Sequence, residues 1–124
     1  NITDLYLHST QVSGNLNFLR SMPNFRDLDT WQGANLENTN MSAYTSLGNL
    51  PAWSCLINIK DTGLDATEVD TFLRDLNAGG GTNGVLDISG TNAAPTDGTT
   101  TGVDGLAVVT SLEAKGWDIT HTAV

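Results

Sequence analysis

A short pattern that recurs along the whole chain constrains its fold more than any other feature. The segment ITHTAV, residues 119–124, reads apolar, polar, polar, threonine, any residue, apolar. Segments of the same form begin earlier at Leu7, Trp31, Ile59 and Ile88, although the second has Ala34 in place of threonine. The intervals between the five starts are 24, 28, 29 and 31 residues. A short internal period of this kind is typical of repeat architectures, in which each turn packs against its neighbours.

The residues that precede each start extend the pattern and predict strands. The residues two positions before the five starts are apolar except for Asp29: they are Leu5, Asp29, Ile57, Leu86 and Trp117. Alternation of apolar and polar residues indicates strands that bury one face. We expect the strands to be parallel, to form one sheet in sequence order, and to centre near Tyr6, Thr30, Asn58, Asp87 and Asp118.

The segments between the strands carry apolar residues at helical spacing. The four sets are Leu16, Leu19 and Met22; Met41, Tyr44 and Leu47; Val69, Phe72 and Leu76; and Leu106, Val109 and Leu112. Spacing of three or four residues places each set on one helical face. Helices are predicted over Thr67–Leu76 and Val103–Lys115. The candidate N-caps are Asp65 or Thr67 for the first helix and Thr101 or Asp104 for the second, with Gly116 as a C-terminal stop.

The repeated form resembles the strand of leucine-rich repeats, L-x-L-x-x-N-x-L, with threonine in the asparagine position. The threonines in that position are Thr10, Thr62, Thr91 and Thr122. The resemblance implies an α/β solenoid of about five turns, with one parallel sheet on the concave side and short helices and loops on the other. It also implies a ladder of threonine hydroxyls bonded to the backbone of adjacent turns. The alternative is that these threonines simply favour strand ends.

Two segments near the C-terminal end bear on the biological setting. The stretches ISGTNAAPTDG and SLEAKGWDIT are similar to repeats of bacterial surface proteins and phage virion proteins. This likeness implies an extracellular, cell-surface or virion location. We expect residues 1–124 to form a single repeat domain with turns starting near residues 5, 29, 57, 86 and 117. Because the chain begins with Asn1 rather than methionine, we expect it to be part of a longer protein.

Charge and composition exclude several classes of partner. The chain has 14 acidic and 5 basic residues, a formal net charge of −9, so it repels phosphate backbones and is not expected to bind nucleic acid. No apolar run approaches the roughly 20 residues of a membrane-spanning helix, so membrane insertion is not expected. Cys55 is the single cysteine, which excludes an intrachain disulfide and predicts a buried apolar side chain.

No arrangement of residues predicts catalysis or a cofactor. His8 and His121 are four turns apart, about 19 Å at about 4.8 Å per strand, which is too far for them to cooperate. The glycine-rich stretch AGGGTNG lacks the lysine and the following helix of a phosphate-binding loop. Asp97 and Asp104 are candidate calcium ligands in a long loop, but EF-hand spacing is absent and a solvated loop is favoured. We therefore expect neither an enzyme nor a bound cofactor.

The outward residues of the predicted sheet define a candidate binding surface. They form two columns: Tyr6, Thr30, Asn58, Asp87 and Asp118, and His8, Gln32, Lys60, Ser89 and Thr120. The first hypothesis is a recognition or adhesion module that binds a protein or glycan on a cell surface through this face. The second is a structural subunit or decoration protein of a virion or surface filament, packed against neighbouring subunits. A solvated face without a ligand is the third possibility.

Overall fold

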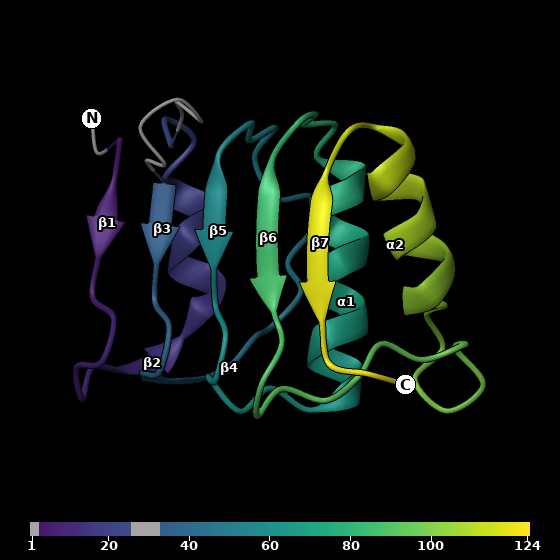
Figure 1. Ribbon diagram of the computed structural model, residues 1–124, viewed down its shortest axis with the longest axis horizontal. Coiled ribbons are helices and arrows are strands. Elements are labelled where there is room, and N and C mark those ends of the chain that lie inside the picture. The colour runs from purple at the N-terminus through teal and green to yellow at the C-terminus, as the bar shows by residue number, and fades with distance from the viewer. Residues whose placement is uncertain (1–2, 26–32) are drawn as a thin grey trace.

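Five short strands run parallel and form one sheet in sequence order (Figure 1). The structure, a computed structural model, describes residues 3–25 and 33–124. The strands of this sheet are β1 (Leu5–Tyr6), β3 (Gly33–Asn35), β5 (Leu56–Asn58), β6 (Val85–Ile88) and β7 (Asp118–His121). Their order is β1-β3-β5-β6-β7, and every neighbouring pair is parallel. The prediction of parallel strands in sequence order is confirmed.

Helical segments cover one face of this sheet (Figure 1). They are a 3₁₀ helix, η1 (Leu16–Ser21), and two α-helices, α1 (Ala66–Ala78) and α2 (Gly105–Ala114). A second, two-stranded parallel sheet joins β2 (Ser13–Asn15) to β4 (Asn40–Ala43). The chain is therefore a mixed α/β protein built on a parallel sheet. No helix in the described ranges is long and apolar enough to span a membrane.

Both predicted α-helices are present, and their caps explain where they begin. The Asp65 side chain accepts a hydrogen bond from Glu68 N, and Glu68 bonds back to Asp65 N, which completes a capping box before α1. Asp104 accepts from Ala107 N at the start of α2. Gly116, with φ of +88°, follows the last turn of α2 in the left-handed conformation that glycine tolerates best.

The second turn lies in a different register from the predicted one. Ala34 pairs with Leu5 on one side and Ile57 on the other, so it occupies the first apolar position of the repeat. Leu36, Thr39 and Met41, all buried, then fill the remaining positions. The prediction that this turn starts near Asp29 and Trp31 is therefore wrong. The predicted strand residues themselves (Asp29, Thr30, Trp31 and Gln32) lie outside the described ranges.

The fifth turn is displaced by two residues from the prediction. Ile119 pairs with Leu86, and Thr120 pairs with Asp87, whereas Trp117 was expected opposite Leu86. Trp117 instead lies just before β7, where it is buried and its Nε1 donates to Gly81 O at 3.0 Å. A Cβ on Gly84 would come within 2.3 Å of the indole ring, so Trp117 packs against this glycine. Burial of the large ring in that space shifts the strand register.

The set Met41, Tyr44 and Leu47, predicted to share one helical face, does not lie in a helix. Met41 lies in β4, and Leu47 is 67% exposed in the loop that follows. Arg20 fixes this loop because its Nη1 donates to Gly48 O and Asn49 O, both at 2.6 Å. The side-chain bonds replace the backbone bonds that a helix would provide.

The core lies between the open sheet and the helical segments. Ile57, Leu86 and Ile88 of the central strands are fully buried, as are Ile59 directly after β5 and Val69, Phe72 and Leu76 of α1. Trp53 is also fully buried, with its Nε1 donating to Met22 O and its ring 5.9 Å from that of Phe25.

Candidate functional site

The candidate site is the sheet face that the helices leave open. Its residues form two columns, defined here as the open sheet face: Tyr6, Asn35, Asn58, Asp87 and Thr120, and His8, Glu37, Lys60 and Ser89. All are exposed or half-buried. They point outward because residues alternate along each strand, as in Ile57 (buried), Asn58, Ile59 (buried) and Lys60.

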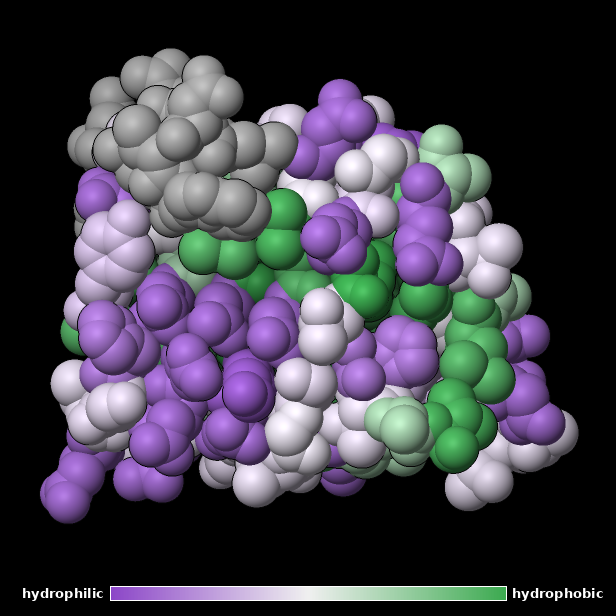
Figure 2. Space-filling view, viewed as in Figure 1, coloured by the Kyte–Doolittle hydropathy of each residue, from purple (hydrophilic) through white to green (hydrophobic). Residues whose placement is uncertain are grey.

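Polar residues gather over the carboxyl-terminal ends of the strands. Figure 2 shows hydrophilic residues over the lower part of the sheet, where the strand arrows of Figure 1 end, with hydrophobic residues above them. Leu56 and Val85 lie two residues before Asn58 and Asp87 on the same strands; they pair with each other and are half-buried. The face therefore combines a broad polar area with a narrow apolar border.

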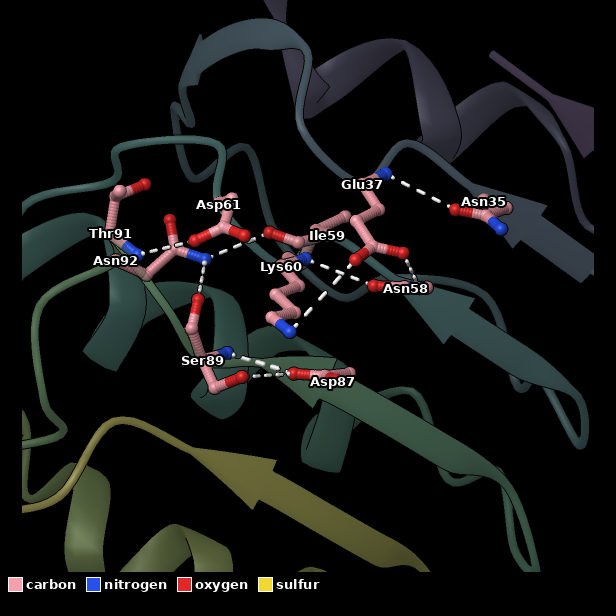
Figure 3. A network of polar contacts seen from close by, with 10 residues as sticks. All are labelled: Asn35, Glu37, Asn58, Ile59, Lys60, Asp61, Asp87, Ser89, Thr91 and Asn92. Atoms are coloured by element: carbon pink, nitrogen blue, oxygen red, sulfur yellow. Dashed lines mark hydrogen bonds and ion pairs between the residues drawn. The ribbon is translucent and has the colours of Figure 1, made fainter. Parts of the chain in front are cut away.

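The first column holds its side chains through a bond that repeats from turn to turn (Figure 3). Asn35 Oδ1 accepts from Glu37 N at 3.2 Å, and Asn58 Oδ1 accepts from Lys60 N at 3.1 Å. Asp87 Oδ1 accepts from Ser89 N at 3.0 Å and from Ser89 Oγ at 2.6 Å. A short side chain that bonds its own backbone two residues later is fixed in direction. Three successive turns thus present oriented polar groups.

Bonds between turns connect the second column to the first (Figure 3). Asn58 Nδ2 donates to Glu37 Oε2 at 3.2 Å, and Lys60 Nζ lies 4.0 Å from Glu37 Oε1. The Lys60 and Glu37 side chains are 40% and 37% exposed, so solvent screens this ion pair and it adds little to stability. Its effect is to hold three side chains in one arrangement on the surface.

The turns below the open sheet face share one backbone conformation. Ser9, Asn38, Asp61 and Gly90 all have positive φ, between 55° and 78°. Asp61 Oδ1 accepts from Thr91 N at 2.9 Å, which links the third turn to the fourth. A Cβ on Gly90 would lie 1.9 Å from Asp61 Oδ1, so glycine is required there to admit the carboxylate.

The predicted threonine ladder is only partly correct. Thr10, Thr39 and Thr62 each bond the carbonyl three residues earlier in their own turn, and Thr62 also contacts a side chain of the adjacent turn, Asn92 Oδ1, rather than its backbone. Thr91, which the ladder was expected to include, is exposed. Thr122 does bond the neighbouring turn, donating to Asn92 O at 2.8 Å.

The asparagine beside Thr91 makes the buried link between turns that the threonines were expected to make. Asn92 Oδ1 accepts from Leu64 N at 2.8 Å and from Thr62 Oγ1 at 3.0 Å. Its Nδ2 donates to Ile59 O at 2.8 Å and to Ser89 O at 3.2 Å. One side chain therefore connects the third turn to the fourth through three hydrogen bonds, and the bond to Ser89 O lies within its own turn.

Thr62→Val should reduce the free energy of unfolding by about 1–3 kcal/mol, because it removes from a buried region the hydroxyl proton that Ile59 O and Asn92 Oδ1 share, so each acceptor retains only its other donor. Thr91→Val is the matched control, since Thr91 occupies the equivalent position of the next turn but is exposed. Urea denaturation of the two variants measures the difference. Equal midpoints would show that the Thr62 hydroxyl has no structural role.

Six of the ten predicted binding residues lie in the columns that the sequence assigns them, and two lie elsewhere on the sheet. Tyr6, Asn58 and Asp87 share the first column, and His8, Lys60 and Ser89 share the second. Asp118 pairs with Val85 and lies in neither column, whereas Thr120 moves to the first column, opposite Asp87. Thr30 and Gln32 lie outside the described ranges.

Two residues of the open sheet face, Asn35 and Glu37, were missed. The signal that could have found them is the segment ANLENTNM, residues 34–41, which matches apolar-x-apolar-x-x-Thr-x-apolar without exception. It overlaps WQGANL, the predicted second copy, which has Ala34 in the threonine position.

The candidate catalytic and metal-binding residues do not converge. His8 follows β1 and His121 ends β7, the two outermost strands of the sheet. Asp97 Oδ1 accepts from Thr99 N and Thr99 Oγ1, and these bonds lower the pKa of the Asp97 carboxyl. Asp104 caps α2. Within residues 3–25 and 33–124, no group of three or more His, Cys, Asp or Glu side chains is placed to hold a metal ion.

Cys55 should react with thiol reagents only after unfolding. It is fully buried, and burial raises its pKa to about 12. The thiolate is the reactive form of cysteine. The pKa of Cys55 is lower in the unfolded chain than in the folded protein, so the stability contributed by burying the neutral thiol is lost as the pH rises from the unfolded pKa toward the folded pKa. Labelling with a chromogenic disulfide at pH about 8 should be slow in buffer and fast in urea. Fast labelling of the native protein would contradict the burial.

Comparison with protein-family models, with curated proteins and with solved structures finds no match to this chain.

Proposed function

We propose that the chain is a leucine-rich-repeat-like solenoid of about five turns. Four turns share an apolar-x-apolar-x-x-Thr-x-apolar sequence, a positive-φ residue before the threonine, and an in-register parallel strand. Those turns begin at Leu5, Ala34, Ile57 and Leu86, and Ile119 begins the fifth strand. The threonine bonds its own turn, and asparagine takes the buried position between turns at Asn92.

We further propose that the protein is a non-enzymatic recognition module, extracellular or virion-associated, that binds a protein or glycan through the open sheet face. The observation that carries this proposal is the fixed polar network of Asn35, Glu37, Asn58 and Lys60. Parallel sheets are usually covered on both faces, so an uncovered face is a candidate for contact with another molecule. Fixed side chains lose little conformational entropy when they bind, which favours recognition.

A binding screen tests this function. Glycan arrays and a displayed peptide library should yield ligands whose affinity falls at least about tenfold in Asn58→Ala, a loss of about 1.4 kcal/mol. Asn40→Ala is the matched control, because Asn40 is exposed in β4, outside the open sheet face. Ligands that bind Asn58→Ala and the wild type equally, or the absence of any ligand, would contradict the proposal.

The alternative, a structural subunit or decoration protein, is favoured by the two outermost strands. Within the described residues, β1 and β7 each pair with a strand on one side only. Strand edges with unpaired backbone groups can add strands from other chains. Sedimentation velocity over a concentration series distinguishes the two functions, because a structural subunit should form larger assemblies and a recognition module should remain monomeric.

A further inference from the structure

The open sheet face presents hydrogen-bond donors and acceptors side by side. Asn58 Nδ2 and Lys60 Nζ are donors, and both contact the carboxylate of Glu37. In the next turn, Ser89 Oγ can donate or accept and lies 2.6 Å from Asp87 Oδ1. A ligand that matches this surface must therefore donate and accept hydrogen bonds within a short span. Hydroxyl groups do both.

The charges on this face exclude anionic ligands. Lys60 is the one Lys or Arg that the described chain places on the face, and it pairs with Glu37. Asp87 on the face and Asp61 beneath it form no ion pair with a described residue. The other described basic residues belong to the helical side: Arg20 in η1, Arg74 in α1 and Lys115 at the end of α2. Phosphate, sulfate and uronic acid groups are repelled by such a surface.

A basic peptide matches the face less well than a neutral polyol. Lysine and arginine side chains only donate hydrogen bonds, so they offer no acceptor to Asn58 Nδ2 or Lys60 Nζ. Lys60 also repels them. The Asp87 carboxylate already accepts two bonds from Ser89, and Glu37 is occupied by Asn58 and Lys60. The acceptors for a cation are therefore already partly satisfied.

Tyr6 adds an aromatic surface at one end of the first column. Tyr6 is 50% exposed and lies beside Asn35 in that column. An aromatic ring with one accessible face can pack against the C–H face of a sugar ring, while neighbouring polar groups bond its hydroxyls.

We infer that the open sheet face binds a neutral oligosaccharide that lies across the strands. The sugar hydroxyls bond Asn35, Asn58, Lys60 and Ser89, and one sugar ring packs on Tyr6. This inference rests on the proposed recognition function and specifies its ligand class. Because the groups are fixed by their own bonds, the face is largely arranged for binding before the ligand arrives.

The test titrates the full chain with hexasaccharides of glucose (β-1,4 and α-1,4), mannose and N-acetylglucosamine, and with a galacturonic acid hexasaccharide as the acidic comparison. Amide NMR spectra report the site. At least one neutral hexasaccharide should bind, with shift changes centred on Asn35, Asn58 and Ser89. Asn35→Ala and Asn58→Ala should each weaken binding at least about tenfold, and Asn40→Ala should leave it unchanged. Raising NaCl from about 50 to about 500 mM should have little effect.

The outcomes separate this inference from the recognition function. Absence of binding by every neutral hexasaccharide, or binding that Asn35→Ala and Asn58→Ala do not weaken, overturns the oligosaccharide inference. If a displayed peptide binds the wild type but not Asn58→Ala, recognition through this face stands and the oligosaccharide class is wrong. A salt-sensitive interaction with a lysine-rich peptide would lead to the same conclusion. If neither sugars nor peptides bind, both proposals fail.

Discussion

Asn92→Ala is expected to lower the free energy of unfolding by about 3–5 kcal/mol, a large loss for one polar side chain. Asn92 is 2% exposed and makes four hydrogen bonds, two accepted and two donated. Its removal breaks all four bonds and leaves Leu64 N without its side-chain partner in a buried region, whereas Ile59 O keeps the Thr62 hydroxyl. Each buried polar group without a partner costs about 1–3 kcal/mol.

The repeat itself provides the control for this prediction. Asn40 occupies the same position in the second turn, directly after Thr39, but it is exposed. Asn40→Ala should therefore change the unfolding midpoint in urea very little. Asn92→Asp keeps the acceptor for Leu64 N but removes the donors to Ile59 O and Ser89 O and buries a charge, so it should also be destabilising. If Asn92→Ala and Asn40→Ala unfold at the same urea concentration, Asn92 does not hold the turns together.

The elements that the sequence predicted correctly are those with local signals. β5 and β6 alternate buried and outward residues within a few positions, and the α1 helix combines a helical apolar face with a capping box at Asp65. Such signals need no knowledge of distant contacts. The predicted helices Thr67–Leu76 and Val103–Lys115 accordingly lie within two residues of α1 and α2 at each end.

The errors arise where a contact between residues far apart in the sequence decides between two possible strand registers. The second turn offers both WQGANL and ANLENTNM, and the choice depends on pairing of Ala34 with Leu5 and Ile57. In the fifth turn, the burial of Trp117 against Gly84 displaces the strand by two residues. The second turn also has a local signal, Thr39 in ANLENTNM, but no neighbouring residue indicates the contact of Trp117 with Gly84.

The candidate site was predicted in part for the same reason. Asn58, Lys60, Asp87 and Ser89 follow directly from alternation in β5 and β6. The link at Asn92 could not be predicted, because Asn40 and Asn92 have the same place in the repeat and differ only in what packs over them. Residue type alone does not distinguish a buried asparagine from an exposed one.

Asp70→Ala should destabilise the protein by about 3–5 kcal/mol and release the loop that precedes α2. Asp70 is fully buried in α1, and its carboxylate accepts from Thr96 N at 3.0 Å. It also accepts from Thr96 Oγ1 at 2.5 Å and Thr101 Oγ1 at 2.6 Å. Among the described residues no basic group forms an ion pair with Asp70, so these three bonds compensate for burial of its charge.

The position of Asp70 explains why one carboxylate fixes a loop rich in threonine and glycine. Thr96 and Thr101 are five residues apart, and their hydroxyls meet at 3.2 Å over the same carboxylate oxygen. A Cβ on Gly105 would lie 2.0 Å from Asp70 Oδ1, so the start of α2 packs directly against the carboxylate. Loss of Asp70 therefore removes the common partner of the loop and leaves a space under α2.

Limited proteolysis together with urea denaturation measures both effects. Asp70→Ala should be cleaved within residues 96–104 at protease concentrations that leave the wild type intact, and its unfolding midpoint should fall. Asp97→Ala is the control in the same loop, because Asp97 is exposed and bonds only its own turn at Thr99. Asp70→Asn should lie between wild type and Asp70→Ala, since its amide oxygen still accepts from Thr96 N. An Asp70→Ala protein with wild-type stability and protease resistance would show that contacts of α2 with α1 hold this loop without the carboxylate.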